Sequence, residues 1–364
     1  MERKELCAKI KEAETAFFGG ECGYCEPYGS GHINDTFLAV FDGKRYILQR
    51  MNHMIFPRPD LLMENIIGVS SHIRKKAGAD KERASLAVVY TRDNKPFFVD
   101  SIGSYWRVYE FCEGTVSRDR VENARDFELC GEGFGAFQGL LSDYPAETLH
   151  ESIANFHNTE KRYESFIASL ERDVCQRATE VEREIRFVKE RREFTGLLLR
   201  EYESGGLPLR VTHNDTKLNN ILFDEVTGEP VCVIDLDTVM PGFSVNDFGD
   251  SIRFGASTAA EDETDLDKVW LDLGLFESYA RGFLKGCGNR LTKRETELLP
   301  IGAIMMTFEC GMRFLTDYLD GDVYFRTHRE KHNLDRARNQ FKLVSDMEKK
   351  LSEMNAIIDK ILGN

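Results

Sequence analysis

The sequence changes character near residue 112, and this change limits the folds that the chain can adopt. Before it, short apolar runs alternate with turn residues, and Asp42-Gly43 joins two of them as a hairpin dipeptide. After it, apolar residues recur at helical spacing, first over residues 127–141 and again through most of 262–363. Strands followed by helices predict an α+β fold, with a small antiparallel β-rich part over 1–112 and a large, mainly helical part over 113–364.

Local signals add detail to the β-rich part. We expect helices over residues 1–18 and 60–76, and a second hairpin in which 86–91 and 96–99 flank a turn at Asp93-Asn94. A further strand over 105–111 would then lead toward the helical part. No internal repeat or low-complexity tract interrupts either part.

Composition excludes several classes of partner. The 364 residues carry a formal net charge of -14, whereas a nucleic-acid-binding protein needs a basic face for phosphate contacts. No stretch approaches the roughly 20 apolar residues of a membrane-spanning helix. The nine cysteines are scattered and odd in number, and no signal peptide precedes them, which is typical of a reducing compartment. We expect a cytoplasmic protein that binds neither nucleic acid nor membrane; the sequence leaves its oligomeric state open.

The second half contains the pattern most specific for chemistry. Asp215 follows His213 by two residues, and Asn220 follows Asp215 by five. Fifteen residues after Asn220, Asp235 ends the apolar run 231–234. An Asp, an Asn five residues later, a strand and a second Asp form the layout of a catalytic loop for phosphoryl transfer and its metal-binding Asp.

Each residue of this pattern has a chemical role that suits phosphoryl transfer. Asp215 can orient a substrate hydroxyl and accept its proton, and Lys217 can neutralise the moving phosphoryl group. Asn220 and Asp235 offer the amide and carboxylate oxygens that Mg²⁺ prefers. The pattern therefore predicts ATP and Mg²⁺ as cofactors. Asp237 could bind metal, hold the loop or meet the substrate.

We expect structural roles for two carboxylates further along the chain. Asp247 and Asp250 lie in the segment Asn246-Asp247-Phe248-Gly249-Asp250, downstream of the metal-binding Asp. We predict that they are structural and form hydrogen bonds with the catalytic loop.

Two segments of the β-rich part are candidates for binding the nucleotide. A glycine-containing segment precedes the first hairpin strand, where backbone amides could approach phosphates. The strand over 105–111 ends where the two parts join and could present backbone groups to adenine. The predicted nucleotide-binding residues are Gly29, Ser30, Gly31, His32, Asn34, Thr36, Gln49, Glu110 and Phe111.

These motifs resemble those of the aminoglycoside phosphotransferase and choline kinase superfamily. The residues that carry the resemblance, in the superfamily's order and spacing, are His213, Asp215, Asn220, Asp235, Gly242 and Asp247. The resemblance implies a protein-kinase-like, two-lobed fold. Residues 1–112 would form the nucleotide-binding lobe, and 113–364 the catalytic and substrate-binding lobe.

Longer runs narrow the resemblance to the N-acetylhexosamine 1-kinases. The similar runs, 31–34, 46–49, 209–220, 247–258 and 309–314, fall between about residue 27 and a point past 340. That resemblance implies ATP- and Mg²⁺-dependent phosphorylation of the anomeric hydroxyl of N-acetylglucosamine or N-acetylgalactosamine. It also implies that the sugar is contacted by Asp215, Asp237, Thr238, Arg313 and Tyr324.

One departure concerns the grip on the phosphates. Protein kinases place a lysine on the third strand and pair it with a glutamate of the following helix. The corresponding strand here reads Tyr46-Ile47-Leu48-Gln49-Arg50, without a lysine, and Glu64 is a poor candidate for the glutamate. Gln49 or Arg50 could take over the role, or Lys217 could carry more of the phosphate contact.

Two alternatives stay open at this point. The chain could be another small-molecule kinase of the superfamily, acting on choline, an aminoglycoside or an amino alcohol. A choline site would need an aromatic cage, and the two tryptophans, Trp106 and Trp270, lie far from the catalytic motifs in sequence. The chain could also be a non-catalytic pseudokinase, but Asp215, Asn220 and Asp235 are all present.

Overall fold

A computed structural model describes residues 3–29, 31, 33–78 and 83–363. The chain divides into two compact units. Unit 1 comprises Met1–Val116, Glu147–Ala154 and Leu222–Met240, and unit 2 comprises Ser117–Ala146, Asn155–Ile221 and Pro241–Asn364. Two segments from further along the chain, 147–154 and 222–240, thus belong to the unit that contains the N-terminal sheet.

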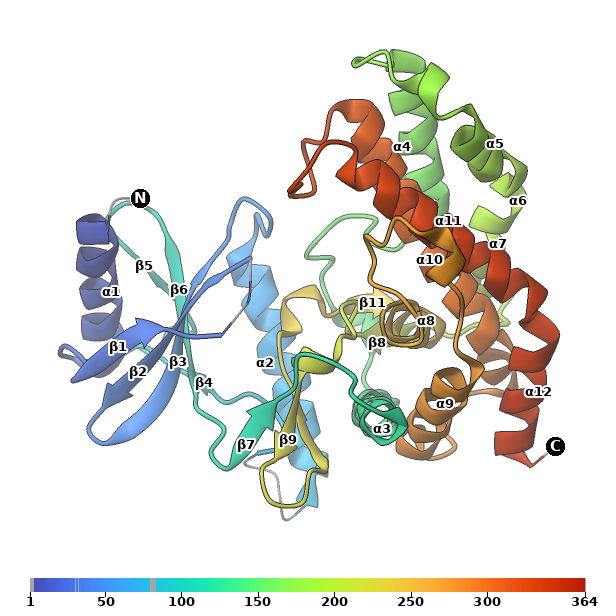
Figure 1. The fold of residues 1–364 in the computed structure, drawn as a ribbon. Helices are drawn as coiled ribbons and strands as arrows, with labels where there is room; N and C mark the ends of the chain where they lie inside the picture. Colours follow the sequence, from blue (N-terminus) through green and yellow to red (C-terminus); the bar gives the residue numbers. More distant parts are fainter. Residues whose placement is uncertain (1–2, 30, 32, 79–82, 364) are drawn as a thin grey trace. The chain divides into compact units, whose positions relative to one another are not determined.

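The main sheet of unit 1 is antiparallel (Figure 1). Its strands are β1 (Tyr24–Pro27), β2 (Asp35–Phe41), β3 (Lys44–Met51), β4 (Val88–Val89), β5 (Phe98–Val99) and β6 (Tyr105–Glu110), in the order β1-β2-β3-β6-β4, with β5 also pairing with β6. The predicted hairpin at Asp42-Gly43 is confirmed: β2 pairs with β3, and both turn residues have positive φ.

The second predicted hairpin is wrong. A turn does form between Thr91 and Lys95, but β4 and β5 do not pair with each other; both pair with β6. The isolated pattern looked like a hairpin because two apolar runs flank a turn. β6 is longer than either run and most of its side chains are buried, and β4 and β5 each pair with two of its residues.

Helix α1 (Arg3–Phe18) covers one face of this sheet (Figure 1). Ala13 and Phe17 pack there with Leu48, Trp106 and Val108 in the hydrophobic core of the unit. Side chains alternate along a strand, so the residues on either side of these core positions point to the opposite face. Thr36, Gln49 and Arg107 stand side by side in the register and share that opposite face.

Unit 1 also contains α2 (Pro59–Lys76) and a second, smaller sheet. Its strands are β7 (Thr115–Ser117), β9 (Ile221–Asp224) and β10 (Pro230–Val233), in the order β10-β9-β7. The chain leaves β10 through a short 3-10 helix, Leu236–Thr238, that directly follows Asp235.

Unit 2 is mainly helical, as predicted for this part of the chain. Its helices are α3 (Ala124–Leu140), α4 (Thr159–Arg172), α5 (Glu182–Glu190), α6 (Arg192–Thr195), α7 (Leu197–Glu203), α8 (Ser244–Gly255), α9 (Leu273–Cys287), α10 (Lys293–Asp320), α11 (His332–Lys349) and α12 (Leu351–Leu362). Strands β8 (Arg210–Thr212) and β11 (Met240–Gly242) form a two-stranded ladder.

Helix α10 runs through the core of unit 2. A capping box between Thr292 and Glu295 fixes its start, and Gly321 in the left-handed conformation ends it. By length and composition α10 could cross a membrane, which the sequence analysis did not anticipate, and 83% of its most apolar 18-residue window is buried inside the structure. That burial is typical of a core helix.

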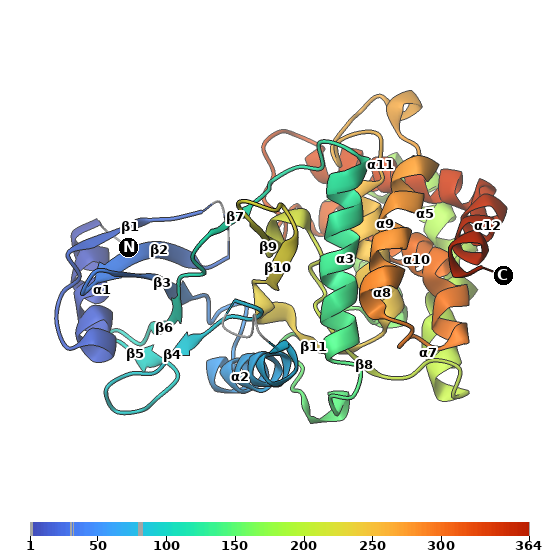
Figure 2. The same cartoon turned by 90° about the horizontal axis from the view of Figure 1, so that it is seen from below.

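Glycines allow α3 and α9 to lie side by side in direct backbone contact (Figure 2). A Cβ atom on Gly282 would lie 1.9 Å from the carbonyl oxygen of Glu128, and one on Gly135 would lie 2.2 Å from that of Phe283. The atoms in the way are backbone atoms, which cannot move aside as a flexible side chain does. This contact fixes α3, and with it the side chain of Gln138.

We predict that Gly282→Ala destabilises the protein by about 1–3 kcal/mol, because the added methyl group forces two helices apart. Gly274→Ala, on the exposed first turn of α9, is the matched control. A Cβ there meets only a carboxylate oxygen of Asp272 at 3.2 Å, and alanine favours the helix by about 1 kcal/mol. Urea denaturation measures both; equal stability of the two variants would contradict the close-contact argument.

Candidate active site

The loop that carries Asp215 is held by a buried carboxylate of α8. The backbone N–H groups of His213 and Asn214 donate to the two oxygens of Asp247, both at 2.8 Å. Gln138 of α3 donates to the same carboxylate at 2.7 Å. Burial raises the pKa of Asp247, and these three donors oppose the rise by favouring the charged form. The predicted structural role of Asp247 is confirmed.

A second contact from α8 holds the loop on the other side of Asp215. The Thr216 N–H donates to Asp250 at 3.1 Å, and the Thr216 hydroxyl donates to the Asp247 carbonyl at 2.7 Å. Ser251 donates to the Thr216 carbonyl at 2.7 Å. The predicted role of Asp250 is confirmed as well. The backbone on both sides of Asp215 is therefore fixed by one helix.

The structure brings together three of the predicted residues, Asp215, Lys217 and Asn220. The Lys217 ammonium lies 2.6 Å from Oδ1 of Asp215, and Asn220 Nδ2 donates to Oδ2 at 3.0 Å. Burial would lower the pKa of Lys217, but Asp215 raises it above its usual value, so the lysine stays charged. Asp215 is 28% exposed and available to a ligand.

The donor set of this loop suits a hard cation. Asn220 uses its Nδ2 on the carboxylate and the carbonyl of Asp215, which leaves its amide oxygen as the ligand atom. In the part of the chain that the structure describes, no group of three or more His, Cys, Asp or Glu side chains could hold a metal ion. A magnesium ion with one or two protein ligands, completed by phosphates and water, requires no such group.

A second polar cluster of unit 2 centres on Glu309 of α10. His157 Nδ1 lies 2.8 Å from one carboxylate oxygen, and the Thr159 hydroxyl donates to the other at 2.5 Å. Burial alone would raise the pKa of Glu309, but the contacts with His157 and Thr159 lower it below its usual value. Sequence reasoning missed Glu309 and His157, although Glu309 opens the run 309–314.

Arg313 lies one helical turn after Glu309 and is surrounded by aromatic rings. Its guanidinium carbon lies 5.4 Å from the ring centre of Phe325, 5.7 Å from Phe156 and 5.8 Å from Tyr324. Asp317, one further turn along, accepts the backbone N–H groups of residues 323–325. The structure thus brings the two predicted residues Arg313 and Tyr324 together, and Asp317 fixes the loop on which Tyr324 stands exposed.

The two clusters of unit 2 act on a common carboxylate. Burial would raise the pKa of Asp250, but Arg253, Lys217 and His157 lower it through their positive charge. Lys217 belongs to the catalytic loop and His157 to the Glu309 cluster. Asp250 thus accepts a hydrogen bond from the loop of Asp215 and is also influenced by a residue of the Glu309 cluster.

In unit 1, several predicted residues meet in a buried polar network. Arg107 forms a two-pronged ion pair with Asp237, and its Nε donates to Gln49 at 2.9 Å. Gln49 donates to the Thr36 hydroxyl at 2.9 Å, and Asn34 donates to Asp237 at 2.7 Å. Burial would lower the pKa of Arg107, but Asp237 raises it, so the guanidinium stays charged. Sequence reasoning missed Arg107.

The structure also places other predicted residues of unit 1. Asp235 is exposed and has a left-handed backbone, and Thr238 is buried. Gly29 has positive φ, and a Cβ on Gly29 or Gly31 would meet no atom within 4 Å. Glu110 ends β6 and is exposed, and Phe111 follows it beneath Arg45. Ser30 and His32 lie outside the described residues, so their predicted roles stay predictions.

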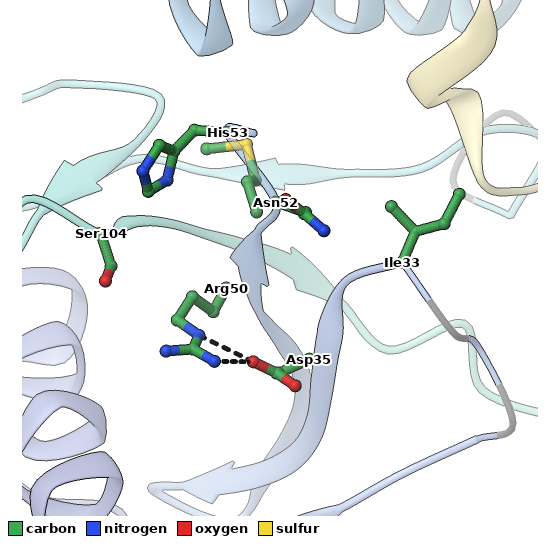
Figure 3. A pocket seen from close by; sticks show the side chains of 7 residues that line it. Ile33, Asp35, Arg50, Asn52, His53 and Ser104 are labelled. Carbon is green, nitrogen blue, oxygen red and sulfur yellow. Dashed lines mark hydrogen bonds and ion pairs between the residues drawn. The ribbon is translucent and has the colours of Figure 1, made fainter. Parts of the chain in front are cut away.

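The two residues named as substitutes for a strand lysine point to different faces of the sheet. Gln49 faces Arg107, whereas Arg50 forms an ion pair with Asp35 in a pocket of about 290 Å³ (Figure 3). The pocket is lined by Ile33, Asp35, Arg50, Met51, Asn52, His53 and Ser104. Glu64 of α2 contacts His150 at 2.9 Å and is largely exposed.

Comparison with known proteins agrees with this architecture. The phosphotransferase enzyme family matches residues 25–280. A microcompartment-associated aminopropanol kinase is 16% identical with a TM-score of 0.60, over 96% of this chain and 98% of that one. Choline kinase from Cryptosporidium parvum is 13% identical with a TM-score of 0.56, over all of both chains. A spectinomycin phosphotransferase solved with ADP and spectinomycin is 11% identical with a TM-score of 0.56, over 97% and 99%.

The chain therefore belongs to the phosphotransferase enzyme family. The predicted protein-kinase-like fold is confirmed. Membership of this family identifies the protein as a phosphotransferase. Sequence identities this low establish the fold but do not identify the acceptor substrate, because one fold serves many substrates.

We predict that Glu309→Gln lowers stability at pH 7 by about 1–3 kcal/mol, since a charged acceptor of two hydrogen bonds is lost. The pKa of Glu309 is lower in the folded protein than its usual 4.5, so its contribution is present above that pH and fades as the pH falls. Denaturation from pH 7 to pH 3 should show the gap to the parent narrowing. Glu297→Gln, at an exposed position of α10, is the control; a gap that stays constant with pH would contradict the charged state of Glu309.

Proposed function

We propose that the protein transfers the γ-phosphoryl group of ATP to the anomeric hydroxyl of N-acetylglucosamine or N-acetylgalactosamine. The observation that supports the proposal is that unit 2 contains both a carboxylate in contact with a lysine and an arginine lined by aromatic rings. Asp215 contacts Lys217, and Arg313 stands among Phe156, Tyr324 and Phe325. Charged and aromatic side chains together suit a sugar, whose hydroxyls form hydrogen bonds and whose ring faces stack.

The chemistry suits the modest base that this site offers. An anomeric hydroxyl is more acidic than an ordinary alcohol, so a carboxylate can accept its proton late in the reaction. The anomeric oxygen bonds to the γ-phosphorus, the bond to the ADP oxygen breaks, and the proton passes to Asp215. Lys217 stabilises the negative charge on the transferred group. When bound, Mg²⁺ would be held by Asn220 and Asp235 and would neutralise charge on the phosphates.

The charges around the acceptor favour a neutral sugar over a cationic amine. Arg313 contributes a positive charge to the cluster. Burial, together with the charge of Arg313, lowers the pKa of the neighbouring Arg162 below its usual value. Aminoglycosides, choline and amino alcohols carry ammonium groups, which this arginine would repel. Trp106, one of two tryptophans available for a choline cage, is buried in the core of unit 1.

The direct test is ADP release with N-acetylglucosamine, N-acetylgalactosamine, choline, an amino alcohol and an aminoglycoside, followed by phosphorus NMR of the product. A phosphate on C1 of either acetamido sugar is the expected result. Turnover with the amines alone would keep the phosphoryl chemistry and overturn the sugar assignment.

We expect Asp215→Asn to lower kcat by a factor of about 10²–10⁴, because it removes the proton acceptor. Binding of MgATP, measured by calorimetry, should change little. Asp267→Asn, in an exposed turn, serves as the control for loss of one carboxylate. Turnover of Asp215→Asn near the parent level would remove Asp215 from the role of base.

Arg313→Ala is expected to raise the KM of the acetamido sugar about tenfold or more while the KM of ATP stays near the parent value. The reason is that a charged hydrogen-bond donor contributes roughly 1.5–3 kcal/mol to binding. Arg326→Ala, an exposed arginine on the following loop, is the matched control. An unchanged sugar KM in Arg313→Ala would exclude Arg313 from the acceptor site.

A further inference from the structure

Unit 1 carries a buried ion pair in place of the pair that protein kinases use. In kinases, a lysine of the third strand binds the phosphates and is held by a glutamate of the next helix. Here β3 has Gln49 on the face shared with Arg107, and Glu64 of α2 contacts His150 on the surface. The positive charge on this face comes from β6 instead, through Arg107.

The Arg107–Asp237 pair is almost completely withdrawn from water. The side chains are 1% and 4% exposed, and Nη2 of Arg107 lies 2.9 Å from Oδ2 of Asp237. Desolvation makes a buried ion pair expensive unless other hydrogen bonds complete it. Gln49 accepts from Arg107 Nε and Asn34 donates to Asp237, so both partners have further contacts. Such pairs are retained in some proteins because they fix one arrangement.

What the pair fixes is the turn that follows Asp235. Asp237 lies in the 3-10 helix Leu236–Thr238, two residues after Asp235. Its carbonyl accepts from the Ser152 hydroxyl at 3.0 Å, and Asn65 of α2 donates to the carbonyl of Val239 at 3.0 Å. The turn is thus held to β6 by the ion pair of Asp237 with Arg107, and to α2 by the hydrogen bond from Asn65.

Asn34 extends this attachment to the glycine-containing loop between β1 and β2. Its Nδ2 donates to Asp237 at 2.7 Å, and its Oδ1 accepts the backbone N–H of Asn52 at 2.9 Å. Gly29 and Gly31 precede Asn34 in the same loop. One half-buried amide therefore connects the proposed phosphate loop, the end of β3 and the turn of the proposed metal ligand.

We propose that Arg107, Asp237 and Asn34 form a positioning unit that sets the glycine-containing loop and Asp235 in register for MgATP. Asp237 accepts three hydrogen bonds from Arg107 and Asn34, and these contacts make it the centre of the positioning unit. The inference rests on the ATP half of the proposed function and is independent of the acceptor.

Asn34→Ala tests the connection without disturbing the ion pair. We expect the affinity for MgATP, measured by calorimetry without any acceptor, to fall about tenfold, while the acceptor KM stays at the parent value and the protein remains folded with a somewhat lower melting temperature. The gain in ATP affinity on adding Mg²⁺ should shrink as well, because Asp235 no longer lies in register with the loop. A merely structural asparagine would not change this magnesium dependence.

Asp35→Asn is the matched control. Asp35 follows Asn34 directly but pairs with Arg50 on the other face of the sheet, so its loss removes a polar contact without touching the positioning unit. We expect parent-like MgATP affinity. A drop equal to that of Asn34→Ala would overturn the inference, because any disturbance of the loop would then suffice.

The ion pair itself is tested by removing both charges together in Arg107→Met/Asp237→Asn. Single substitutions leave an unpaired buried charge and can unfold the protein, whereas the double variant leaves none. We expect a folded protein whose MgATP affinity is at least tenfold lower. If Asn34→Ala and the double variant both bind MgATP as the parent protein does, the inference is overturned and the proposed function still stands. A parent protein that binds no MgATP would overturn the proposed function, and the inference with it.

Discussion

The hydrogen bonds that Asp247 accepts are the interaction on which unit 2 depends for its chemistry. A buried carboxylate holds two consecutive backbone N–H groups, and this fixes the start of the catalytic loop. The position of Asp247 in turn depends on glycines. Gly249, two residues later on α8, lies against the backbone of α10 at Gly302, where a Cβ would approach to 2.3 Å. The position of the catalytic loop therefore depends on the close packing of α8 against α10.

The two units use charge in different ways. In unit 2, the side chains of Asp215, Lys217 and Arg313 are partly exposed and accessible to a ligand. In unit 1, Arg107 and Asp237 satisfy each other out of reach of water. Partly exposed charges suit binding and transfer, whereas a closed pair suits the holding of a fixed geometry. Phosphoryl transfer needs both, since it consists mostly of positioning and electrostatic stabilisation.

The sequence predicted well what depends on neighbours along the chain. The Asp42-Gly43 hairpin, the change from strands to helices and the structural roles of Asp247 and Asp250 were all readable from local pattern and spacing. The grouping of Asp215, Lys217 and Asn220 lies within six residues, so a single loop accounts for it. The metal and substrate roles of these residues stay predictions.

What the sequence could not show are contacts between distant segments. Arg107 and Asp237 are 130 residues apart, and Thr159 and Glu309 are 150 apart. In the sequence, Arg107 looks like one residue of an ordinary core strand. Only the pairing of β6 with β3 shows that its side chain shares a sheet face with Gln49. The same limit applies to the segments 147–154 and 222–240, which belong to unit 1 through contacts that no local pattern announces.

Helix α10 places Glu309, Arg313 and Asp317 at intervals of four residues, hence on one side of one helix. The loop that Asp317 organises follows at once and brings Tyr324 with it. The whole stretch from Glu309 to Phe325 is thus a single continuous module, supported from behind by the helix core. Residues 156–159 complete the cluster from elsewhere in the chain, because Phe156 lies against Arg313, and His157 and Thr159 contact Glu309. A change in this short segment would therefore alter the surroundings of α10 without any change in α10 itself.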